Sequence, residues 1–140
     1  MACGENPRSK SDAKIMPESR MGEAWLFRQR FEVARELMFA QNDWCESAKG
    51  LADVYGSSAH MHAANRYPER LVDETLVALL RGQVILNVHC YETYDLEMLV
   101  KLMKEFKFQI STFHHGLEAW RVPQLLKDHQ ISAAIFADHW

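Results

Sequence analysis

The sequence has no long hydrophobic run and no excess of charge of one sign. Its longest apolar stretch, Val84–Val88, is interrupted at Asn87, whereas a membrane-spanning helix needs roughly 20 apolar residues. Sixteen basic residues stand against nineteen acidic ones, and the net charge is −3, so nothing favours nucleic acid or an anionic membrane as a partner. The 140 residues suffice for one ordinary domain but not for a complete barrel of about 250 residues. A soluble globular protein is expected.

Cysteine is scarce, and no CxxC pair suggests a thiolate zinc site. The three cysteines, Cys3, Cys45 and Cys90, are odd in number and widely spaced, which argues against a disulfide framework and favours a reducing compartment. The N-terminal stretch MACGENPRSKSDAK has no apolar segment behind its charges and does not resemble a secretory signal. We therefore expect a cytoplasmic protein.

The pattern of residues predicts one domain over 1–140 with four consecutive parts. Residues 1–20, which hold one glycine, two prolines and three serines, are expected to form a loop. Residues 49–70 lack a clear period and indicate an insertion, and residues 71–140 contain repeated strand and helix patterns. Between the loop and the insertion, residues 22–48 are expected to form a long helix, because apolar residues recur at helical spacing along one stripe: Ala24, Phe27, Phe31, Ala34 and Met38.

The repeated part predicts a parallel sheet. Its expected order is a helix over 71–80 ended by Gly82, strands over 83–89, 108–113 and 131–137, and helices over 95–106 and 117–129. The helix over 95–106 is expected to bury one face: Leu96, Leu99, Val100 and Met103. Strands that alternate with helices through short connections form right-handed βαβ units. No glycine-rich dinucleotide-binding or phosphate-binding loop follows any of these strands. The predicted fold class is therefore α/β.

Histidines stand where two of these strands end. His89 closes the strand over 83–89, and His114 and His115 follow the strand over 108–113. The carboxyl ends of parallel strands are where ligands bind in α/β folds, and neighbouring strands lie about 5 Å apart. Imidazoles at both ends could therefore bind one ion of zinc, iron or manganese. They could equally be hydrogen-bonded residues without a metal, and the spacing alone favours neither interpretation.

Other histidine and carboxylate pairs are weaker candidates. His60 and His62 could bind a metal together if they stood on a strand, but no apolar strand underlies them, and a solvated loop is the favoured interpretation. Asp138 and His139 follow the last expected strand and could form a ligand pair.

Two glutamates and one cysteine also lie near the strand ends. Glu92 and Glu118 each follow a histidine by three residues and could either orient metal ligands or cap the turns that follow. Cys90 adjoins His89 and could be a nucleophile. Because the sequence fixes no separate base beside it, a buried small apolar residue is the favoured interpretation.

Several motifs together carry a resemblance to a known family. The stretches GENPRS, SRMGEAWLFRQRFEVAREL, VHCYETYDL and HHGLEAW resemble, in order and spacing, the middle of a metal-dependent amidohydrolase from the branch near imidazolonepropionases and prolidase-like amidohydrolases. The resemblance covers nearly all of the chain except residues 49–70 and corresponds to barrel strands 4 or 5 to 7. It implies a partial (β/α)8 barrel, about half of the barrel, with a long N-terminal helix.

The resemblance also implies a chemistry. The family hydrolyses amide or other carbon–nitrogen bonds of small molecules, including cyclic amides, with one or two divalent metals that activate a water; zinc is the expected ion. By resemblance His89 is the ligand that ends the fifth strand. His115, directly before a glycine, is the ligand that ends the sixth, with His114 as the alternative.

The departures from the family pattern concern the rest of the site. The HxH motif that ends the first strand is absent, as is the lysine that some members carry before GENP. The aspartate that ends strand eight would follow Trp140, so no catalytic residue is assigned. We therefore expect a fragment of a hydrolase that is inactive alone. The alternative is a non-catalytic half-barrel that assembles with a second copy or with a completing chain.

Overall fold

A long helix and a small parallel sheet make up the described part of the chain. The structure, a computed structural model, describes residues 1–4, 17–59 and 66–135, so the candidates His60, His62, Asp138 and His139 lie outside it. In chain order the elements are α2 (Arg20–Tyr55), η1 (Gly56–Ser58), α4 (Leu71–Leu80), β1 (Leu86–His89), α5 (Thr93–Phe106), β2 (Ile110–His114), η2 (Ala119–Arg121), α6 (Pro123–Asp128) and β3 (Ser132–Ala134).

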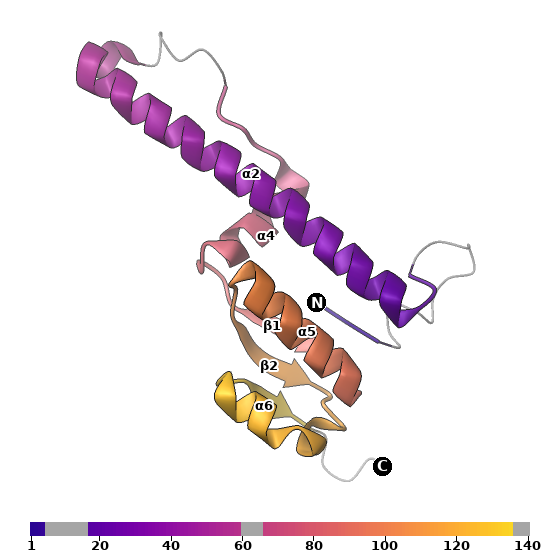
Figure 1. The fold of residues 1–140 in the computed structure, drawn as a ribbon. Coiled ribbons are helices and arrows are strands. Elements are labelled where there is room, and N and C mark those ends of the chain that lie inside the picture. The colour runs from indigo at the N-terminus through magenta and orange to yellow at the C-terminus, as the bar shows by residue number, and fades with distance from the viewer. Residues whose placement is uncertain (5–16, 60–65, 136–140) are drawn as a thin grey trace.

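Helix α2 begins at a side-chain cap. The hydroxyl of Ser19 accepts a hydrogen bond from the N–H of Gly22 at 3.1 Å, which satisfies one of the donors that a helix start leaves open. The helix runs two residues earlier and seven residues later than the expected 22–48 and enters the region expected to be an insertion. Figure 1 shows its C-terminal part extending past the sheet. No described helix is both long and apolar enough to cross a membrane.

The buried stripe of α2 is centred as expected but differs in its members. Phe31 and Ala34 are buried, whereas Ala24, Phe27 and Met38 are only half-buried. The helix also buries Glu23, Leu37 and Gln41, two of them polar and therefore invisible to an apolar pattern. Ala34 and Leu37 pack against Val77 of α4 in a small second cluster.

Helix α4 ends at Gly82, as the sequence predicts. Gly82 has a φ of 70° and donates its N–H to the carbonyl of Leu79, while Gln83 donates to the carbonyl of Ala78. This pair of bonds is the Schellman arrangement, which needs a left-handed residue after the helix. Leu71, the first residue of α4, is 87% exposed.

The sheet is parallel, with strand order β1-β2-β3. Val88 of β1 is in register with Phe113 of β2, and both are fully buried beneath the apolar face of α5, which covers the sheet in Figure 1. The expected face of α5 is confirmed, since its four predicted core residues are all buried: Leu96, Leu99, Val100 and Met103.

Several element boundaries differ from the expectation. Strand β1 starts at Leu86 and not at Gln83, and Ile85 before it is 73% exposed. Helix α5 begins at Thr93 instead of Asp95. The single helix expected over 117–129 is two pieces, η2 and α6, because Pro123 starts α6 and the residue before a proline is disfavoured in helical conformation.

The cysteines correct the expectation of a chain without disulfides. Cys3 and Cys90 form a disulfide with a Cα–Cα distance of 5.2 Å, within the usual range for such a bond. Both are fully buried, and Cys45 is free and exposed. The sequence hides the pair because 87 residues separate its members, and they meet only when residues 1–4 lie beside β1. Cysteine spacing therefore gives no support for a reducing compartment.

Candidate functional site

Three imidazoles gather at the carboxyl end of the sheet. His89 ends β1 and His114 ends β2, and the two are in register. Their ring centroids lie 5.4 Å apart, and the ring of His115 lies 4.7 Å from that of His89. Residues 25 and 26 positions apart in the sequence thus become neighbours, as the parallel arrangement of their strands predicts.

The backbone of His115 is in an unusual conformation. Its φ is 59°, the left-handed region that costs a residue with a side chain about 1 kcal/mol or more. Its carbonyl accepts a hydrogen bond from the N–H of Leu117 at 2.8 Å. The ring of His115, at this turn, lies closer to the ring of His89 than the ring of His114 does.

The pKa of His89 is lowered from its ordinary value. Packing of its ring against its neighbours removes part of its hydration, and the charges of His115 and His114 act in the same direction. A lowered pKa favours the neutral imidazole near neutral pH, and the neutral imidazole is the form that binds metals.

The donor set fits two positions of a metal site. A zinc site in proteins has three or four protein ligands, and His89 and His115 would supply two imidazole nitrogens. Among the residues that the structure describes, no group of three or more histidine, cysteine or carboxylate side chains is arranged to hold a metal ion. Further ligands would therefore have to come from outside the described ranges.

Glu118 connects the two loops beyond the strands. Its carboxylate accepts hydrogen bonds from the N–H and the hydroxyl of Thr93 at 2.9 and 3.0 Å and pairs with Arg121 at 2.9 Å. Its N–H donates to the carbonyl of Tyr91. These contacts satisfy the first turn of α5, which precedes Glu118 in the chain. Neither interpretation offered for Glu118 included this helix.

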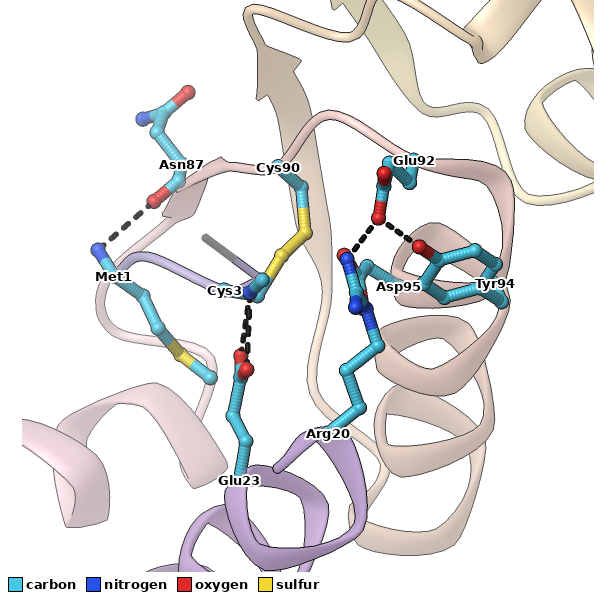
Figure 2. The surroundings of a disulfide bond; sticks show 10 residues. Met1, Cys3, Arg20, Glu23, Asn87, Cys90, Glu92, Tyr94 and Asp95 are labelled. Atoms are coloured by element: carbon cyan, nitrogen blue, oxygen red, sulfur yellow. Dashed lines mark hydrogen bonds and ion pairs between the residues drawn. A yellow bond between two sulfur atoms is a disulfide. The ribbon is translucent and has the colours of Figure 1, made fainter. Parts of the chain in front are cut away.

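Glu92 contacts side chains from two helices, α2 and α5. Its carboxylate accepts hydrogen bonds from Arg20 and from the hydroxyl of Tyr94 (Figure 2). The hydrogen bond to Glu92 raises the pKa of Tyr94 to about 12, with desolvation acting in the same direction. Glu92 thus fastens the start of α2 to the start of α5.

The contacts of Glu118 predict a measurable change in its titration. The N–H of Thr93 first, and then its hydroxyl, lower the pKa of Glu118, so the carboxylate stabilises the fold above its unfolded pKa, and this contribution is lost as the pH falls through the folded value. Thr93→Val removes the hydroxyl and keeps the N–H. We expect the pKa of Glu118 to move up toward, but not reach, its ordinary value in carboxyl-carbon NMR titrations.

Thr75→Val, at an exposed position of α4, is the control for this titration and should leave the pKa of Glu118 unchanged. An equal pKa shift in both variants would contradict the assignment of the shift to Thr93.

A hollow adjoins the histidines. Its volume is about 430 Å³ and it is lined by Tyr91, Glu92, Leu117 and Glu118. The ring of Tyr91 stacks on that of His115 at a centroid distance of 5.8 Å, so the hollow opens beside the imidazoles. Tyr91 and Leu117 were not among the residues predicted from the sequence, although each lies two residues after a histidine at a strand end.

Cys90 is not available as a nucleophile in this structure. Its sulfur is bonded to that of Cys3, and both residues are fully buried. The interpretation of Cys90 as a buried small residue is correct about its burial. It did not include the disulfide with Cys3.

Known proteins resemble this chain in sequence and in structure. No family model matches the sequence. The chain is 41% identical over 144 aligned residues, 99% of its length, to the protein named amidohydrolase tasK from Hapsidospora irregularis. In three dimensions it matches the crystal structure of an amidohydrolase from Thermotoga maritima MSB8 with a TM-score of 0.72, 24% identity and 97% of the chain covered. The chain has the fold of part of an amidohydrolase.

The share of each relative that is matched is small. The chain spans 14% of the length of tasK and 32% of the Thermotoga maritima chain. The predicted fold class, an α/β partial barrel with a long N-terminal helix, is confirmed by the structural match, although the sheet of the described residues has three strands.

Proposed function

We propose that this chain belongs to the amidohydrolase family and is a segment of a metal-dependent hydrolase that acts on carbon–nitrogen bonds. The 41% identity to tasK over nearly the whole chain supports the family. The observation that carries the proposal of a metal centre is the meeting of His89 and His115 at the carboxyl end of the sheet, 4.7 Å apart between ring centroids. The branch near imidazolonepropionases and prolidase-like enzymes, with strands 4 or 5 to 7 represented, is part of this proposal.

The proposed contribution of this chain is binding. His89 and His115 would hold a divalent ion, zinc by the nature of the donors, through neutral imidazole nitrogens; His114 is the alternative to His115. The metal, when bound, would activate a water and polarise the carbonyl of a small amide-type substrate. The lowered pKa of His89 keeps its ring in the metal-binding form. The hollow beside Tyr91 would lie next to this centre.

We further propose that the chain is inactive alone. Two imidazoles leave a zinc ion short of the ligands that hold it tightly, and no residue of the chain is assigned as the general base. A completing chain or a longer parent protein would supply both. A cytoplasmic location stays a prediction.

The test is zinc titration by calorimetry with the full chain. We expect binding in the unaltered protein and a loss of affinity of about tenfold or more in the His89→Ala, His115→Ala double variant. His114→Ala decides between the two candidate ligands at the carboxyl end of β2, His114 in the strand and His115 directly after it, because only removal of the true ligand weakens binding. His129→Ala, in the turn after α6, is the matched control. Equal zinc affinity in the unaltered chain and the double variant would overturn the proposed centre.

A second candidate function is a non-catalytic interaction module. All three residues of β3 are exposed, as are Ile85 and Ile135 at 73% and 68%, and an open sheet edge with apolar neighbours favours association with another strand. Light scattering during size-exclusion chromatography distinguishes the two. A stable complex with a second copy, together with zinc affinity unaffected by the double variant, would favour the module.

A further inference from the structure

Residues 1–4 lie along the outer edge of β1 like a short additional strand. The N–H of His89 donates to the carbonyl of Met1 at 3.0 Å, and the N–H of Cys3 donates to the carbonyl of His89 at 2.9 Å. Ala2 forms a parallel bridge with His89. The residue at the end of β1 therefore has both of its backbone groups bonded to this segment.

The segment is fastened at a second point to helix α2. The N–H of Gly4 donates to both carboxylate oxygens of Glu23, at 2.9 and 3.0 Å. Glu23 lies in the first turn of α2 and is only 2% exposed. A few residues thus connect the start of the long helix with the end of the strand that carries His89.

One covalent bond holds this connection. The disulfide joins Cys3 to Cys90, the residue directly after β1. Without it, the segment would be held by a few hydrogen bonds and by the packing of the Cys3 and Met1 side chains. Short segments at a sheet edge that are held in this way open locally more readily than the core does.

We propose that the Cys3–Cys90 disulfide is a redox switch that fixes residues 1–4, and through them the backbone of His89. A dithiol reductant cleaves it by thiol–disulfide exchange. The sulfur–sulfur bond breaks, Cys3 and Cys90 each gain a proton as thiols, and the two sulfurs of the reductant form a disulfide. Residues 1–4 then leave the edge of β1, and both backbone groups of His89 lose their partners there. This inference does not depend on a metal at His89.

The free cysteine provides an internal standard for the test. Cys45 is exposed, so its rate of alkylation by iodoacetamide reports an accessible thiol. The full chain, purified without reductant, is alkylated natively and digested. A second sample is first treated with dithiothreitol and freed of it before a timed alkylation, and the labelling of each cysteine is followed by mass spectrometry. Circular dichroism checks that the reduced chain keeps its helices.

The expected result has two parts. In the oxidised chain only Cys45 is labelled, and a peptide pair linked through Cys3 and Cys90 is found. In the reduced chain Cys3 is labelled within roughly tenfold of the rate of Cys45, since local opening exposes it, and re-oxidation restores the linked pair. Three outcomes would overturn the proposal: no linked pair in the oxidised chain, labelling of reduced Cys3 that is about a hundredfold slower than that of Cys45 or more, or loss of the helical signal on reduction.

Discussion

Replacing Phe31 with alanine is expected to lower the free energy of unfolding by about 3–5 kcal/mol, the usual cost of removing a large aromatic side chain from a core. Phe31 is 1% exposed. Its ring stacks on Phe106 of α5 at 5.2 Å and on Phe108 at 4.7 Å between centroids. These contacts join the long helix to the layer that covers the sheet, so the substitution leaves a cavity between the two parts of the chain.

The measurement is urea unfolding followed by circular dichroism. Phe39→Ala is the matched control, because Phe39 stands on the same helix and is 53% exposed. Its loss should cost about 0.5 kcal/mol, as is usual for surface positions. If the two variants unfold at the same urea concentration, then α2 does not pack against α5 in solution as it does here.

The parts of the fold that the sequence predicts are those with a regular apolar period. The face of α5 is an example, because residues three and four positions apart must share one side of a helix. The C-terminal part of α2 is the counter-example. Beyond Gln41 its residues are mostly exposed, so no core imposes a stripe on them and the pattern fades before the helix ends at Tyr55.

The candidate site also has one part that the sequence predicts and one part that it does not. The meeting of His89 with His114 could be predicted, because two apolar runs separated by a helix indicate parallel strands, and the ends of neighbouring parallel strands lie close together. The left-handed backbone of His115 does not follow, because local sequence gives no sign that a histidine will occupy a conformation typical of glycine. That conformation decides which imidazole comes closer to His89.

Contacts between distant residues that belong to no periodic pattern could not be predicted from the sequence. The bond between Cys3 and Cys90 and the hydrogen bonds of Gly4 to Glu23 join positions 87 and 19 residues apart. Neither pair belongs to a periodic pattern. They depend on how residues 1–4 are placed after the sheet and α2 have come together.

The second large effect is expected at Gly4. Its φ is 71°, and a Cβ built on it would lie 2.5 Å from Oδ2 of Asp95. Asp95 is 2% exposed, and Arg20 holds its carboxylate through a hydrogen bond of 3.1 Å. The carboxylate therefore cannot move aside without disturbing a partly buried ion pair, and this is costly because the carboxylate itself is buried and would lose its compensating charge.

We expect Gly4→Ala to lower the free energy of unfolding by about 3 kcal/mol, from a left-handed alanine at about 1 kcal/mol and a displaced buried carboxylate at about 2 kcal/mol. Gly82→Ala is the matched control: its φ is 70°, nearly the same, but its added Cβ meets no atom within 4 Å. It should therefore show the backbone cost alone, about 1 kcal/mol. Urea unfolding under oxidising conditions measures both. Equal losses of unfolding free energy in the two variants would mean that the carboxylate of Asp95 moves aside without cost. The start of α5 would then hold residues 1–4 less closely than these distances indicate.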